Sequence, residues 1–287
     1  MQQALPTNLF AGLAGDGALL LPVYLIALVL GLSIPDDRAS RPLIELTEAL
    51  SRLFFRINSF ITAHLWAPLL LGSASLAAAL AAGVGPYREL LLVVVIDLAL
   101  VLGLLLPGWR FLRRKRADLP SLSALAVPVL TAVATGHHHA ALASLARYAT
   151  ADLRIANRLG SAAFPLFAMF GRAGSAMVAA ASFTVILRSY SSMSLAAGDV
   201  LWIIGAASVT AFALAAAPGG AVAAALALLA AGYGRGLEES YLVVDPVLPL
   251  LIAIGVAVDV VIGGAIAVAV GARERLLIDP RPKRAQR

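Results

Sequence analysis

Long apolar runs follow one another along most of this sequence, and they constrain its fold more than any other feature. Crossing a bilayer takes about 20 mostly apolar residues. Five runs reach about this length, over residues 17–34, 59–84, 88–107, 161–187 and 246–270. Apolar residues make up 61% of the chain and charged residues 13%, against about 45–50% and about 25% in soluble domains. The sequence therefore predicts an all-α polytopic membrane protein with about five spanning helices.

Two further apolar runs are interrupted near the middle by residues that break a helix. Residues 119–150 are broken at Gly136–His139, and residues 200–232 are broken at Pro218–Gly220. Each half is too short to cross a bilayer, so each run is expected to form a re-entrant hairpin of two helices that returns to the same side. A kinked pair of helices that crosses fully is the alternative for each run.

The distribution of positive charge favours the hairpins. If both broken runs are re-entrant, 18 of the 22 Lys and Arg residues fall on one membrane face. Positive residues accumulate on the cytoplasmic side, so we expect two opposed hairpins and a cytoplasmic C-terminus in a bacterial inner membrane. The order of hairpin and charged span then occurs twice with inverted orientation, which is typical of secondary transporters. The net charge of +6 is thus interpreted as a topology signal rather than as nucleic-acid binding.

Charged residues inside the predicted spans are the sharpest functional candidates. Arg172 interrupts the fourth span, and Asp259 lies near the middle of the last one. A charge at bilayer depth is costly unless it is paired or hydrated, and it usually marks a substrate or ion site. The alternative is a structural ion pair that holds two helices together. Asp97, inside the third span, is a further candidate for ion coupling or proton transfer.

The tips of the two expected hairpins carry the other candidates. The tip residues are His137, His138 and His139 in the first hairpin and Pro218, Gly219 and Gly220 in the second. Consecutive side chains diverge, and the chain has no Cys, so the histidines are a poor metal site. A hydrogen-bonding or pH-sensitive tip is one interpretation of them, and a hydrated cap without a direct role is the other.

Nothing in the sequence supports enzymatic chemistry. It has no nucleophile elbow, no paired carboxylate cluster and no Walker-type phosphate loop. We therefore expect neither catalysis nor ATP-driven transport, and no cofactor apart from a coupling ion, H⁺ or Na⁺. Ser175, Ser182 and Ser208 are expected to bond carbonyls of their own helices, the common role of serine in membrane helices.

Several stretches resemble the dicarboxylate/amino acid:cation symporters, the glutamate transporter family. Leu5–Phe10 (LPTNLF) resembles the start of that family's fourth segment, and Phe54–Gly72 resembles its fifth. Leu159–Met177 resembles the seventh segment, with Gly174-Ser175-Ala176 in place of G-T-A. Ala215–Gly220 (AAAPGG) resembles the A-G-V-P-G-A tip of the second hairpin. The resemblance implies a glutamate-transporter-like fold and a homo-oligomer, which is a trimer in that family.

The sequence departs from that family at its functional motifs. The sodium-binding N-M-D is replaced by Gly171-Arg172-Ala173, and three histidines stand at the serine-rich tip. Of the acidic series in the last span only Asp259 remains, with glycines at the Arg and final Asp positions. We therefore expect altered or lost sodium coupling, with Arg172 as a fixed cation and Asp259 as its partner or as the anchor of a substrate amine. The three helices before the family's fourth segment have no counterpart here, and a partner membrane chain is expected to supply them if they are needed.

These observations predict a secondary active transporter of a small organic anion or amino acid that works by alternating access. Residues 1–84 are expected to form a scaffold with oligomer contacts, and residues 85–287 the moving, substrate-carrying unit. The expected substrate site combines both hairpin tips with Arg172, Gly174, Ser175 and Asp259. The alternatives are a transport-inactive membrane subunit that completes its fold with a partner chain, and a passive channel.

Overall fold

The chain is helical throughout its described part. The computed structural model describes residues 21–35, 37–64, 73–74, 77–78, 81, 85–115, 119–151, 155–190, 194–213, 221–234, 236–274 and 277. Within these ranges there is no strand, only an isolated bridge between Ile155 and Leu277. The α-helices are α2 (Leu21–Ser33), α3 (Arg41–Ala63), α5 (Arg88–Lys115), α6 (Ala126–Thr135), α7 (His138–Ala151), α8 (Asn157–Phe170), α9 (Ala173–Val185), α10 (Ala197–Ala213), α11 (Ala221–Tyr233) and α12 (Leu248–Arg273). The predicted all-α class is confirmed.

Three helical stretches of the described part are long and apolar enough to cross a membrane. They cover Gly85–Arg114, Ala163–Ser189 and Ser240–Arg273. These stretches confirm membrane-length helices at three of the five predicted spans, 88–107, 161–187 and 246–270. The other two spans stay predictions: α2 contributes 13 residues to the first, and most of residues 65–84 lie outside the described part.

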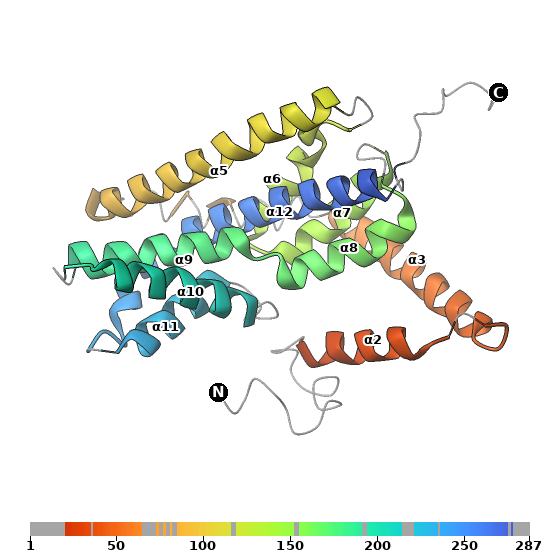
Figure 1. The fold of residues 1–287 in the computed structure, drawn as a ribbon, viewed down its shortest axis with the longest axis horizontal. Helices are drawn as coiled ribbons and strands as arrows, with labels where there is room; N and C mark the ends of the chain where they lie inside the picture. The colour runs from red at the N-terminus through yellow and green to blue at the C-terminus, as the bar shows by residue number, and fades with distance from the viewer. Residues whose placement is uncertain are drawn as a thin grey trace.

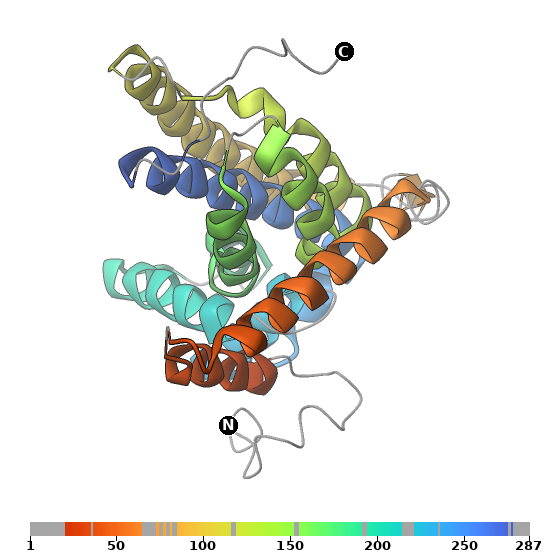
Figure 2. The same ribbon diagram turned by 90° about the vertical axis from the view of Figure 1, so that its right-hand side faces the viewer.

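Helix α12 is the centre of the packing. It contacts α6, α7, α8, α9 and α11, and it runs beside α9 through the middle of the molecule (Figures 1 and 2). Small residues allow this close packing, as is usual where helices associate without a hydrophobic driving force. A Cβ on Gly264, for example, would lie 2.5 Å from Cδ2 of the buried Leu125, so the glycine lets the start of the first hairpin seat on α12.

Helix α5 lies at the edge of this bundle. It packs against α9, but only 11% of its most apolar stretch is buried, against 67% in each of the other two membrane-length helices. Figure 1 shows it running along one side of the molecule. An apolar helix exposed to this extent is suited to a lipid environment.

Both interrupted runs fold as paired helices. In residues 119–150, a 3₁₀ turn (Leu122–Leu125) leads into α6, and the chain breaks at Gly136 before α7, which packs back against α6. In residues 200–232, α10 packs against α11. The second tip, with Pro218, Gly219 and Gly220, lies outside the described residues. The predicted helix–break–helix form of the first run is confirmed, and the membrane face from which each hairpin enters stays a prediction.

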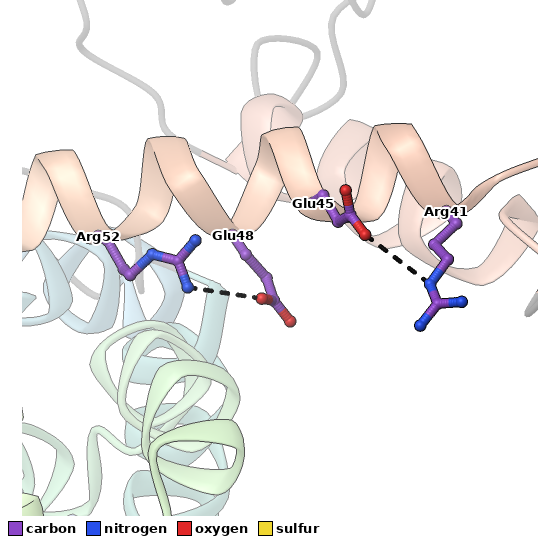
Figure 3. Close-up of polar contacts among 4 residues, drawn as sticks. All are labelled: Arg41, Glu45, Glu48 and Arg52. Atoms are coloured by element: carbon purple, nitrogen blue, oxygen red, sulfur yellow. Dashed lines mark ion pairs between the residues drawn. The ribbon is translucent and has the colours of Figure 1, made fainter.

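Helix α3, which carries five charged residues, contacts α7. On its exposed face, Nε of Arg41 lies 3.7 Å from Oε1 of Glu45, and Nη1 of Arg52 lies 3.7 Å from Oε2 of Glu48 (Figure 3). Both pairs have the i,i+4 spacing that brings side chains together on a helix. Exposed pairs of this kind contribute about 0.3–0.5 kcal/mol each to stability. They therefore stabilise α3 slightly and do not determine the fold.

Candidate functional site

The fourth predicted span is a broken helix, and Arg172 lies at the break. Helix α8 ends at Phe170, and Gly171 and Arg172 have non-helical dihedrals before α9 begins at Ala173. The N–H of Gly171 donates to the carbonyl of Phe167 at 2.8 Å and closes α8. A Cβ on Gly171 would lie 2.6 Å from that same carbonyl oxygen, so a glycine is required at this turn. The interruption at residues 171–174 is thus confirmed.

Asp259 of α12 caps the N-terminus of α9 from another helix. Its Oδ1 accepts from the backbone N–H of Gly174 at 2.6 Å and of Ser175 at 3.3 Å, and its Oδ2 accepts from Oγ of Ser175 at 2.6 Å. The first N–H groups of a helix have no partner within the helix, and an acidic oxygen there also meets the positive end of the helix dipole. Because Asp259 is fully buried, its carboxylate replaces the water that these N–H groups would otherwise need.

Two glycines bring α9 and α12 close enough for this cap. A Cβ on Gly174 would lie 2.4 Å from the carbonyl oxygen of Gly255 and 2.6 Å from Cβ of Val258. A Cβ on Gly255 would lie 3.2 Å from Cα of Ser175. Both contacts involve atoms that cannot rotate away. The first turn of α9 therefore rests directly on the backbone of α12, one turn from Asp259.

The three histidines at the tip of the first hairpin differ in their exposure. Gly136 has a left-handed backbone (φ 65°), and its N–H donates to the carbonyl of Ala132 at 2.8 Å, a common way to end a helix at glycine. The turn leaves His137 exposed, while His138 is only 2% exposed and His139 is half-buried. The three histidines therefore do not act as one cluster: His138 and His139 face the protein interior, and His137 does not.

Six of the predicted site residues come together in this region. The positive charge of Arg172, which is 6% exposed, acts on Asp259 and also on His138 and His139. The hairpin tip, the helix break and the middle of α12 thus meet around one buried cation. Gly174 and Ser175 join them through the hydrogen bonds to Asp259. No group of three or more His, Asp and Glu side chains suited to a metal ion occurs in the described residues.

Asp97 lies apart from this cluster, and the three serines differ in their hydrogen bonds. Asp97 is half-buried in α5, and within the described part of the chain no hydrogen bond or ion pair joins it to the cluster. The prediction that Ser208 bonds its own helix is confirmed, since its Oγ donates to the carbonyl of Ile204 at 2.8 Å. For Ser175 it is wrong, because the neighbouring carboxylate of Asp259 is the stronger acceptor. Ser182 is buried and has no hydrogen-bond partner among the described residues.

Comparison with known proteins identifies the family. The model of the sodium:dicarboxylate symporter family matches residues 1–272. The chain belongs to the sodium:dicarboxylate symporter family. No curated protein matches it. Membership confirms the resemblance of the sequence to these symporters, and it makes the chain an integral membrane protein of a transporter family.

This symporter-family chain has a further polar contact that the sequence does not single out. At the open end of the second hairpin, Oη of Tyr233 donates to Oδ1 of Asp199 at 3.2 Å, and the ring of Tyr233 meets those of Phe183 and Trp202 edge to face. Asp199 also accepts from the N–H of Ala196 and so caps α10. An acid in the first turn of an otherwise apolar helix was the available signal.

Proposed function

We propose that this family member is a secondary active transporter that carries a small organic anion, a dicarboxylate or an amino acid, by alternating access. In this proposal the fixed charge of Arg172 takes the place of a mobile sodium ion, so sodium coupling is altered or lost. The observation that carries it is a buried arginine at a helix break, within electrostatic reach of a hairpin tip and of Asp259. Broken helices are where transporters of this architecture bind substrates and ions.

The carboxylate of Asp259 supports the choice of an anionic substrate. Its two oxygens already accept three hydrogen bonds from the first turn of α9. In this conformation the oxygens of Asp259 are used to cap α9. The positive charge of Arg172 is therefore the group that would attract the carboxylate of a substrate. Arginine binds carboxylates with a planar fork of donors, which favours organic acids over simple halide ions.

The assignment of a scaffold part and a moving part of the chain is also a proposal. Helix α3 contacts α7, whereas α6 to α12 pack on one another around the break at Arg172. This packing supports residues 85–287 as the moving unit and residues 1–84 as scaffold. The proposal also includes a homo-oligomer, on the resemblance to the family, and a C-terminus in the bacterial cytoplasm, on the distribution of positive charge. The two tip glycines and Pro218 would complete the substrate site from the second hairpin.

Uptake by reconstituted protein tests this function. Proteoliposomes are given radiolabelled succinate or L-aspartate, and the initial rate is measured against concentration. We expect saturable uptake of one of the two. Saturation excludes a passive channel, whereas no uptake of either compound would contradict transport and favour the inactive subunit.

Arg172→Gln is expected to reduce this uptake about tenfold or more, the effect of losing one charged hydrogen bond. Arg188→Gln serves as the matched control, because Arg188 is exposed in the π-helical turn Ile186–Tyr190 that follows α9. Arg172→Lys keeps the charge and should retain more uptake than Arg172→Gln. Equal uptake by Arg172→Gln and by the unchanged protein would remove Arg172 from the site.

A further inference from the structure

Two buried histidines at the first hairpin tip hold ring nitrogens that no described residue satisfies. Nδ1 of His138 and Nε2 of His139 are both buried, and neither has a hydrogen-bond partner among the described residues. A buried polar atom without a partner costs about 1–3 kcal/mol. Such atoms therefore suggest a group that binds there in another state of the protein.

The charged groups near His138 and His139 indicate which kind of group can bind to these ring nitrogens. Arg172 and the adjacent histidines are the charged or titratable groups that act on His138 and His139. Among the elements packed against α7, the 3₁₀ turn Leu122–Leu125 and α6 carry no ionisable side chain, α12 contributes Asp259 and, at its C-terminal end, Arg273, and α8 has Arg158 in its first turn. The charged residues of α3 are exposed: four of them form the pairs of Figure 3, and the fifth is Arg56.

A proton on these imidazoles and a cation at Arg172 oppose each other. Without substrate, adding a proton places a second positive charge in a buried region where the carboxylate of Asp259 is already used by α9. An anion bound at Arg172 reverses this balance, because its negative charge attracts the imidazolium and its oxygen accepts from the new N–H. Anion binding and proton binding are then thermodynamically linked.

We propose that the His138–His139 pair carries the coupling proton, so that the protein takes up one proton with each organic anion. One proton from the solution binds to an imidazole nitrogen when the anion binds beside Arg172. It is released to the other side when the anion leaves. The proton thus takes over the role of the coupling ion at a site whose cation is fixed. This inference rests on the proposed transport of an anion.

The linkage is measured on the unchanged protein in detergent. Succinate and L-aspartate binding are followed between about pH 7 and about pH 9, where an ordinary histidine is mostly neutral before the anion binds and succinate is fully ionised. The same titrations are run in weak buffer with a pH indicator. We expect uptake of one proton per bound anion and, in the upper part of this range, a rise in Kd of about tenfold per pH unit, as one linked proton requires.

Three variants locate the proton. His138→Gln and His139→Gln keep a polar group of similar size, and the two together are expected to abolish proton uptake and flatten the pH dependence of Kd. His64→Gln is the matched control, since His64 is the exposed histidine at the end of α3 and has no place in the expected site, and it should behave like the unchanged protein.

Anion binding without proton uptake would overturn the proton proposal and leave the transport function standing. Proton uptake that survives in the double variant would also overturn it, by placing the proton elsewhere. If neither compound binds at any pH, the proposed function itself fails, and this inference fails with it.

Discussion

Replacing Asp259 with alanine is expected to lower the free energy of unfolding by about 3–5 kcal/mol. The substitution leaves two backbone N–H groups and the hydroxyl of Ser175 without their acceptor in a fully buried place. It also removes the negative charge on which the buried Arg172 acts. The loss is measured as the fall in Tm of the purified protein in detergent, followed by circular dichroism.

Two graded variants show whether the cap is the cause. Asp259→Asn keeps one acceptor oxygen at the helix N-terminus but removes the charge. The Tm of this variant should therefore lie between those of the unchanged protein and the alanine variant. Ser175→Ala removes only the hydroxyl that donates to Oδ2 and is expected to cost about 1–2 kcal/mol. An alanine variant at position 259 with an unchanged Tm would contradict the cap.

Replacing Gly174 with alanine is expected to lower the free energy of unfolding by about 2–4 kcal/mol. The added Cβ would meet the carbonyl oxygen of Gly255 and Cβ of Val258, at 2.4 Å and 2.6 Å. Both atoms belong to the main body of α12, so the helices must separate, and the hydrogen bonds to Asp259 lengthen with them. The same melting experiment measures the loss.

Gly205→Ala is the matched control for this substitution. Gly205 lies in α10, where a Cβ meets nothing within 4 Å. Alanine has the higher helix propensity, so this variant should be as stable as the unchanged protein or slightly more so. If Gly174→Ala and Gly205→Ala melt at the same temperature, α9 and α12 are not held at the distance that the structure gives them.

The parts of the fold that follow from local pattern could be predicted from the sequence. Apolar runs of bilayer length predicted α5, the α8–α9 pair and α12, because length and hydropathy are properties of a single segment. The breaks at Gly136 and Gly171 were also predictable, since glycine is the residue that a left-handed or crowded turn requires. These signals need no knowledge of what packs against the segment.

The partners of the charged residues could not be predicted in the same way. The sequence suggested Arg172 or a substrate amine as the partner of Asp259, because opposite charges inside a membrane pair. The charge of Arg172 does act on Asp259, but the described hydrogen bonds of Asp259 go to backbone and hydroxyl groups two and three residues beyond Arg172. That choice depends on how α12 is rotated against α9, and thus on Gly174 and Gly255, which lie 81 residues apart in sequence.

The same limit applies to the histidine tip. Three equivalent residues in the sequence become one exposed and two inward-facing side chains, because the left-handed turn at Gly136 fixes where α7 begins. Asp97 and Asp259 are both aspartates within apolar runs of the sequence, but Asp97 lies in the peripheral helix α5. Burial of a charge by neighbouring helices, rather than its presence in an apolar run, distinguishes the two.

The sodium dependence of substrate binding tests most directly whether Arg172 stands in for a sodium ion. The Kd of succinate or L-aspartate, whichever is transported, is measured while choline replaces sodium at constant ionic strength. With the charge supplied by Arg172, Kd should change by less than about twofold, which is under about 0.5 kcal/mol. A Kd that falls tenfold or more as sodium is added would contradict a fixed cation and show that a mobile one is still required.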